Sequence, residues 1–100
     1  MSKNNYRISR QAIEDLDKIW IYTFNKWTKE QADRYFDLII TEIEFLADNF
    51  MTAKSAEQTR KNYRVTKVKS HLIFFRKAEN DIVEIVRILH QRMDIKTHLN

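Results

Sequence analysis

The chain has 100 residues, of which 43% are hydrophobic and 32% charged, a composition typical of one ordered globular domain. It contains no cysteine, which excludes disulfides, thiolate metal sites and cysteine nucleophiles. It also contains no glycine and no proline, which excludes glycine-rich phosphate loops and dinucleotide-binding fingerprints. The turns must therefore rely on Asn, Asp, Ser and Lys.

The positive charge is concentrated in the second half of the chain. Residues 1–50 contain seven Lys or Arg and nine Asp or Glu, a balance of −2, whereas residues 51–100 contain eleven and five, a balance of +6. A basic half favours an acidic partner or a phosphate backbone, although it can also serve solubility alone. The N-terminus has no apolar signal region and no apolar run approaches about 18 residues, so we expect a cytoplasmic protein without a membrane span.

The first half of the chain predicts a short strand and two helices. Residues 6–8 indicate the strand, and Ser9 is a suitable N-cap for a helix over residues 10–26, where apolar residues recur at helical spacing. The segment TKEQ at 28–31 matches a capping box, in which the threonine and glutamine satisfy two helix amides. It begins a second helix, whose apolar stripe runs over residues 32–50. So short a link between two amphipathic helices predicts an antiparallel helical hairpin.

Four large aromatic residues belong to these helices: Trp20, Trp27, Phe36 and Phe45. They could fill the core or form a platform on which nucleic-acid bases stack. Because aromatic side chains at helical spacing usually pack inside, we expect them in the core.

The second half of the chain changes to the period of strands. Residues 51–62 are polar and aperiodic and predict a loop, with room for one helical turn. Three strands are predicted after it: 63–68, 71–76 and 82–89. The turns between them are expected at Lys69-Ser70 and Glu79-Asn80. The last two runs are apolar on both faces, so they should be central strands. The order β-α-α-β-β-β predicts an α+β fold with the helical hairpin on one face of a mostly antiparallel sheet.

The last strand carries an arginine among apolar residues. Strict alternation places Arg87 with Val83, Ile85 and Leu89, on the side away from His90. Charged residues are seldom buried without a partner, so Arg87 indicates either an internal ion pair or a binding role. Candidate partners are Glu84, Asp94 and the carboxylates of the helices.

His90 is the natural candidate for acid–base chemistry, because the unperturbed pKa of histidine lies near neutrality. Metal-free RNA cleavage would need a base, an acid and cations, and His90 with Arg76 and Arg87 could supply one proton transfer and the charge. No second acid–base residue stands out. His71, His90 and His98 lack metal-ligand spacing, so we expect neither a metal nor a cofactor. A histidine at a strand end is usually structural.

Three segments resemble the ParE branch of the RelE/ParE toxin superfamily: KWTKEQADRY (26–35), SHLIFFR (70–76) and IVRILHQRMD (85–94). The resemblance spans nearly the whole chain as a single toxin domain. It implies the toxin of a type II toxin–antitoxin module, of the kind that stabilises plasmids, with a ParD-like antitoxin as its partner. ParE relatives inhibit DNA gyrase, whereas RelE relatives cut messenger RNA on the ribosome.

RelE-like nucleases resemble one another in a cluster of lysines and arginines and a late aromatic residue or histidine. The tail IKTHLN offers only Lys96 and His98 and no tyrosine, so the resemblance favours a toxin that acts by binding. Two alternatives stay open: a nuclease that uses His90, Arg76 and Arg87, and an inactive homologue that only binds its antitoxin. One departure is that the family usually has a glycine before the second strand, where this chain reads MTAKSAEQTRKNYR.

Two contact surfaces follow from this interpretation. The antitoxin is expected along the outer side of the helical hairpin and the opening strand. Because arginine is enriched at interface hot spots and recognises phosphate and carboxylate, we expect six residues of the basic half to contact gyrase, with or without its DNA. They are Arg60, Arg64, Arg76, Arg87, His90 and Arg92.

Overall fold

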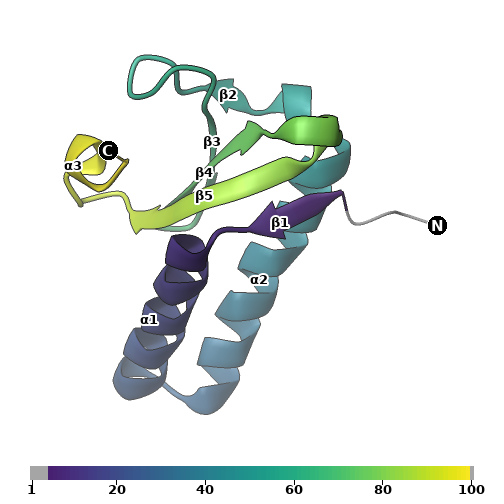
Figure 1. Ribbon diagram of the computed structural model, residues 1–100. Helices are drawn as coiled ribbons and strands as arrows, with labels where there is room; N and C mark the ends of the chain where they lie inside the picture. The colour runs from purple at the N-terminus through teal and green to yellow at the C-terminus, as the bar shows by residue number, and fades with distance from the viewer. Residues whose placement is uncertain (1–4, 100) are drawn as a thin grey trace.

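The computed structural model describes residues 5–99 and consists of a helical hairpin packed on a five-stranded sheet (Figure 1). The helices and strands follow in the order β1 (Tyr6–Ile8), α1 (Arg10–Lys26), α2 (Lys29–Asp48), β2 (Lys54–Ser55), β3 (Arg64–Val68), β4 (His71–Lys77), β5 (Val83–His90) and α3 (Ile95–Leu99). Short 3₁₀ turns lie at Phe50–Thr52 and Glu79–Asp81. The predicted α+β fold is confirmed, with β2 and α3 as additions that the sequence did not indicate.

The sheet has the order β1-β5-β4-β3-β2. β1 runs parallel to β5, and the other pairs are antiparallel. The prediction that β4 and β5 are central is confirmed, because each has a neighbour on both sides. The edges are the short strands β1 and β2. Figure 1 shows the hairpin on one side of the sheet, with the connection between α1 and α2 projecting beyond it.

Both helices begin at the caps that the sequence predicts. The Ser9 hydroxyl accepts a hydrogen bond from the amide of Ala12 at 3.0 Å, and the Thr28 hydroxyl accepts one from the amide of Gln31 at 3.1 Å. Each bond satisfies a helix amide that has no carbonyl partner, which typically stabilises a helix by about 1 kcal/mol. Only Trp27 and Thr28 separate α1 from α2, so the hairpin is antiparallel and tight.

Two groups of apolar side chains form the core, one on each face of the sheet. The larger one lies between the sheet and the hairpin, and its largest fully buried members include Ile39, Ile43, Ile73, Phe75 and Ile85. The smaller one lies under the loop after β2 and under α3, and consists of Ala56, Tyr63, Phe74, Leu89 and Leu99. Burial on both faces explains why the middle residues of β4, LIFF at 72–75, are apolar without alternation.

Two of the four aromatic residues expected in the core are at the surface. Trp27 is 66% exposed and Phe45 is 51% exposed, so their assignment to the core is wrong. Trp27 is the C-cap of α1, at the end of the hairpin that projects beyond the sheet (Figure 1). Trp20 and Phe36 are half-buried, and Trp20 stacks on Phe24 at 5.2 Å between ring centroids.

A β-bulge in β5 overturns the strict alternation expected for that strand. Phe74 and Phe75 are adjacent in β4, but their partners in β5 are Arg87 and Ile85, which leaves Val86 as an extra residue. The extra residue reverses the faces of all residues after it. Two residues three positions apart consequently reach the same core, on the hairpin side: Ile85 and Ile88.

The turns form without glycine, as predicted. Four residues have positive φ angles between 55° and 69°: Asn62, Lys69, Asn80 and Asp81. Asn and Asp tolerate this left-handed region best among residues with a side chain, and Lys69 is the exception. No helix within residues 5–99 is long and apolar enough to cross a membrane.

Candidate functional site

The six residues expected to contact a target do not form one cluster. In the register of β4 and β5, His90 pairs with His71 at one end, and Arg76 pairs with Glu84 near the other. His90 and Arg76 therefore lie on the order of 17 Å apart, at about 3.4 Å per residue along the strands.

Arg76 belongs to a network of surface ion pairs with no net charge. Its Nη2 lies 2.6 Å from Glu84 Oε1, and Glu84 Oε2 lies 3.3 Å from Arg7 Nε. Arg7 also donates to Glu79 at 2.8 Å, and this hydrogen bond lowers the pKa of the Glu79 carboxyl. Two arginines and two glutamates balance one another, so the network itself adds no net positive charge.

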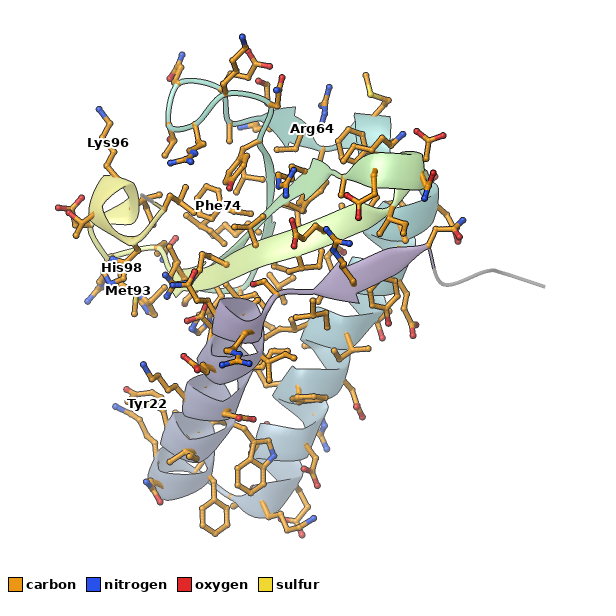
Figure 2. All side chains as sticks on the ribbon, in the orientation of Figure 1. Tyr22, Arg64, Phe74, Met93, Lys96 and His98 are labelled. Atoms are coloured by element: carbon orange, nitrogen blue, oxygen red, sulfur yellow. The ribbon has the colours of Figure 1, made fainter. Side chains whose placement is uncertain are left out.

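Arg60 and Arg64 each tie two separate segments of the chain together. Arg64 Nη1 donates to the carbonyl of Ala53 at 2.6 Å, and its guanidinium carbon lies 5.3 Å from the ring centroid of Phe50 (Figure 2). Arg60 Nη1 donates to the carbonyl of Leu99 at 3.3 Å. Neither makes an ion pair within residues 5–99. Arg60 ties the loop between β2 and β3 to α3, and Arg64 ties the start of β3 to the segment before β2.

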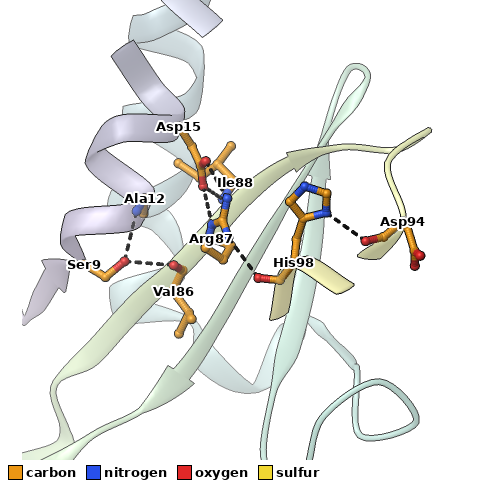
Figure 3. Close-up of polar contacts among 8 residues, drawn as sticks. All are labelled: Ser9, Ala12, Asp15, Val86, Arg87, Ile88, Asp94 and His98. Atoms are coloured by element: carbon orange, nitrogen blue, oxygen red, sulfur yellow. Dashed lines mark hydrogen bonds and ion pairs between the residues drawn. The ribbon is translucent and has the colours of Figure 1, made fainter. Parts of the chain in front are cut away.

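Arg87 forms a two-point ion pair with Asp15 of α1 (Figure 3). Arg87 Nε lies 2.8 Å from Asp15 Oδ2, and Nη2 lies 2.9 Å from Oδ1. Arg87 Nη1 also donates to the carbonyl of His98 at 2.9 Å, which ties α3 to the sheet. Of the candidate partners that the sequence offered for Arg87, a helix carboxylate is the one that forms the ion pair. A role for Arg87 in target binding stays a prediction.

The position of Asp15 follows from the shortness of β1. Because β1 ends at Ile8, the edge of β5 beyond Ile85 has no strand beside it. Residues of the incoming helix satisfy this edge instead: the hydroxyl of Ser9 donates to the carbonyl of Val86 at 2.8 Å, and the amide of Ile88 donates to Asp15 Oδ2 at 2.9 Å. Asp15 is only 6% exposed and is the one charged residue classed as buried within residues 5–99.

A groove lies between α1 and the ends of β4 and β5. It consists of two adjoining hollows of about 390 and 560 Å³, which share Tyr22, His71 and His90. We call it the histidine groove. Met93 lines the first hollow, and Trp27 lines the second. Figure 2 shows Tyr22 and Met93 on the same side of the molecule, both projecting outward.

The hydrogen bonds at the floor of the histidine groove fix the tautomers of both histidines. Tyr35 lies 3.0 Å from the carbonyl of Val68, which can only accept, so the tyrosine hydroxyl donates to it. His71 Nδ1 lies 2.7 Å from the same hydroxyl and must donate to it, which leaves His71 Nε2 as an acceptor. The amide of Arg92 donates to His90 Nδ1 at 3.1 Å, so neutral His90 carries its proton on Nε2. The pair therefore offers one acceptor and one donor.

Burial keeps His71 neutral. The loss of hydration, with a smaller contribution from His90, lowers the pKa of His71 from its usual 6.5 to about 4, while Asp15 acts weakly in the opposite direction. The two rings lie edge to face with centroids 5.2 Å apart. At neutral pH the His71 imidazole is therefore a hydrogen-bond acceptor at Nε2 and not a cation.

Sequence reasoning singled out His90 but missed His71 as its neighbour. The missing information is the register of β4 and β5, which the bulge at Val86 alters. The helical wall of the groove was also missed, because Lys18 and Tyr22 look like ordinary surface residues of an amphipathic helix.

The structure separates the residues of the nuclease alternative. Arg76 lies at the other end of the sheet from His90, and the guanidinium of Arg87 is bound to Asp15. Within residues 5–99 there is no group of three or more His, Asp or Glu side chains arranged to hold a metal ion.

Known proteins of similar sequence share one family. Residues 6–95 match the family model described as "ParE toxin of type II toxin-antitoxin system, parDE". Toxin ParE1 of Caulobacter vibrioides is 39% identical over 94 residues, which cover 94% of this chain and 96% of that protein. Toxin ParE1 of Mycobacterium tuberculosis is 31% identical over 96 residues, which cover 96% of this chain and 98% of that protein.

Among solved structures, the fold is similar to that of a chain from the "Chromosomal ParDE TA system from P. aeruginosa". The TM-score is 0.73 at 17% sequence identity, over 88% of this chain and 98% of that chain. At this identity the structural likeness shows the fold, and the sequence matches show the family.

Proposed function

The chain belongs to the ParE family of toxins of type II toxin–antitoxin systems, and from this premise we propose that it inhibits DNA gyrase by binding. In this proposal it acts in the cytoplasm, and a ParD-like antitoxin neutralises it in a hetero-oligomeric complex. Such a pair would stabilise the replicon that encodes it. No catalytic residue is required, because inhibition follows from occupying the target.

The observation that carries the proposal is the turn between β5 and α3, at residues 91–94. Arg92 and Met93 are exposed there, and Lys96 follows at the start of α3. Of the six predicted contact residues, Arg92 is the one whose side chain makes no hydrogen bond or ion pair to another residue in the 5–99 range. Arginine and methionine are enriched at protein interfaces, and an arginine without internal partners is available to one.

The other five predicted residues stay part of the proposed target surface. Arg60 lies beside α3, Arg64 lies beside Phe50, and His90 lies beside Arg92. Arg76 and Arg87 already hold carboxylates, so their contribution would come from positioning β4, β5 and α3.

A growth assay tests this assignment. Expression of the chain should stop cell division and fragment the chromosome, and Arg92→Ala should weaken both effects at least about tenfold in the dose required, as expected for an interface hot spot. Arg34→Ala is the matched control. Arg34 is exposed on α2, so this substitution removes the same charge from the other half of the chain. Full toxicity of a folded Arg92→Ala variant would remove Arg92 from the target surface.

One observation favours the alternative of a ribosome-dependent nuclease: His71 lies beside His90, so two imidazoles share one groove. General acid–base catalysis contributes typically about 10²–10⁴-fold in rate, so His90→Ala should then abolish cleavage of messenger RNA. Primer extension on RNA from expressing cells detects such cuts. If His90→Ala keeps full toxicity and no cuts appear, the nuclease alternative fails.

A further inference from the structure

The two hollows of the histidine groove follow one another along α1. Their shared lining, Tyr22, His71 and His90, joins the hollow beside Met93 to the hollow beside Trp27 at the end of the helix. The lining runs from His71 and His90, at the ends of β4 and β5, to Trp27, the C-cap of α1. An elongated ligand fits this shape better than a compact one.

The charge of the groove favours an anion. Three lysines line it, Lys18 and Lys26 from α1 and Lys69 from the turn between β3 and β4. None of them makes an ion pair with another residue of the described range 5–99. The one carboxylate in the lining, Asp15, is already bound to Arg87. The groove therefore carries uncompensated positive charge.

Two solvent-exposed aromatic side chains line the groove together with these lysines. Tyr22 is 62% exposed and Trp27 is 66% exposed, and Lys26 Nζ lies 5.7 Å from the Tyr22 ring centroid. Exposed aromatic rings interleaved with cations are the combination on which unpaired nucleic-acid bases stack while phosphates meet the charges. The carboxylates of an acidic peptide would satisfy the lysines, but they provide no ring to stack on Tyr22 and Trp27.

The floor of the groove adds hydrogen-bonding groups of both kinds. His71 Nε2 accepts and His90 Nε2–H donates, because the other nitrogen of each ring already makes a hydrogen bond within the protein. Base edges present donors and acceptors together, so they can engage both histidines at once.

We propose that the histidine groove is a binding site for single-stranded nucleic acid, with phosphates at Lys18, Lys26 and Lys69 and bases against Tyr22 and Trp27. A duplex hides its base faces, so it fits the groove less well. The proposal concerns a ligand of the chain itself and does not depend on gyrase being the target.

The test is fluorescence anisotropy of the purified full chain with a short fluorescein-labelled oligothymidylate. Wild-type protein should bind saturably and with strong salt dependence. Lys18→Ala/Lys26→Ala should reduce the slope of log affinity against log salt by about 1.4, at about 0.7 for each phosphate contact on a single strand. Trp27→Ala should weaken binding about tenfold or more, within the range for loss of one stacked base.

Matched controls separate the groove from general charge and from general exposure of aromatics. Lys54→Ala/Lys61→Ala removes the same charge from exposed residues that do not line the groove. Phe45→Ala removes an aromatic ring of similar exposure on α2. Both controls should change the affinity less than about twofold, since distant surface residues contribute only through the weak, screened field. Circular dichroism and thermal melting verify that every variant is folded.

Three results would overturn the proposal. The first is an equal loss of affinity in Lys54→Ala/Lys61→Ala, which would make binding a property of the whole basic surface. The second is saturable binding of a labelled oligoglutamate with the same sensitivity to Lys18→Ala/Lys26→Ala, which would assign the groove to an acidic peptide. The third is the absence of saturable oligothymidylate binding by folded wild-type protein.

Discussion

Asp15 links three parts of the molecule through two carboxylate oxygens. It binds Arg87 of β5 at two points and accepts the amide of Ile88, while Arg87 in turn holds α3 through the carbonyl of His98. The pair is largely removed from water, with side-chain exposures of 13% for Arg87 and 7% for Asp15. A buried pair of this kind stabilises little relative to an apolar replacement, but removal of one partner leaves an uncompensated charge.

Asp15→Ala should therefore destabilise the fold by about 3–5 kcal/mol in urea unfolding. The double variant Asp15→Ala/Arg87→Ala should be no less stable than Asp15→Ala, because it removes the isolated cation as well. Asp33→Ala is the control: Asp33 pairs with Lys29 at the surface, and its loss should cost at most about 1 kcal/mol. A loss for Asp15→Ala as small as for the control would show that the ion pair is not structural.

His71 should make stability depend on pH between about 4 and its usual 6.5. In this window the unfolded chain binds a proton that the folded chain does not, so the free energy of unfolding falls as pH falls from 6.5 toward 4. Because His71 is only half-buried, solvent screening limits the effect to about 1 kcal/mol. The groups that face His71 are His90, Asp15 and Tyr35.

The variant His71→Asn isolates this contribution, since an asparagine amide can still donate toward Tyr35 but does not titrate. Urea unfolding of both proteins at several pH values should give curves that converge as the pH falls to 4. If the free energy of unfolding of the two proteins changed in parallel with pH, His71 would take up its proton as readily in the folded as in the unfolded state.

At the scale of elements, the hairpin of α1 and α2 is both the best predicted part and the part with the most unexplained surface. Its caps, its length and its apolar stripe could be predicted from the sequence, because they depend on local spacing. The exposure of some of its apolar side chains could not be predicted, because exposure depends on where the sheet ends. These side chains include Ile13, Ile21, Phe24, Leu38 and Phe45.

We expect this outer side of the hairpin to bind the antitoxin, as an apolar face receives an amphipathic helix. Phe24→Ala/Leu38→Ala should weaken the complex with the ParD-like antitoxin at least about tenfold in isothermal titration, the loss typical of a hot spot. Met51→Ala is the control, because Met51 is 71% exposed but lies outside the hairpin. An unchanged affinity in the double variant would place the antitoxin elsewhere, with the edge strand β1 as the next candidate.

At the scale of the whole molecule, the sequence predicted the layers and the central strands because those follow from period and composition. Three features could not be predicted from the sequence, because each is fixed by tertiary contacts. They are the bulge at Val86, the two-residue strand β2 and the five-residue helix α3. The helix α3, for example, is held by Arg87 through the carbonyl of His98 and by Arg60 through the carbonyl of Leu99, in a tail with little apolar periodicity.

The candidate site was harder to predict than the fold for the same reason. His90 and the arginines were visible as residue types, but the pairing of His90 with His71 and of Arg87 with Asp15 depends on strand register and on the entry of α1. Charge alone suggested one basic surface. The structure instead divides it into a neutral ion-pair network around Arg76, a buried pair at Arg87 and an exposed turn at Arg92.

Inhibition of DNA gyrase is best tested in a supercoiling assay with purified chain, relaxed plasmid and ATP. We expect loss of supercoiling together with trapped double-strand breaks, both suppressed by prior addition of the antitoxin and both weakened by Arg92→Ala. Unimpaired supercoiling without broken DNA, at a protein excess and with the fold verified by circular dichroism, would contradict this expectation.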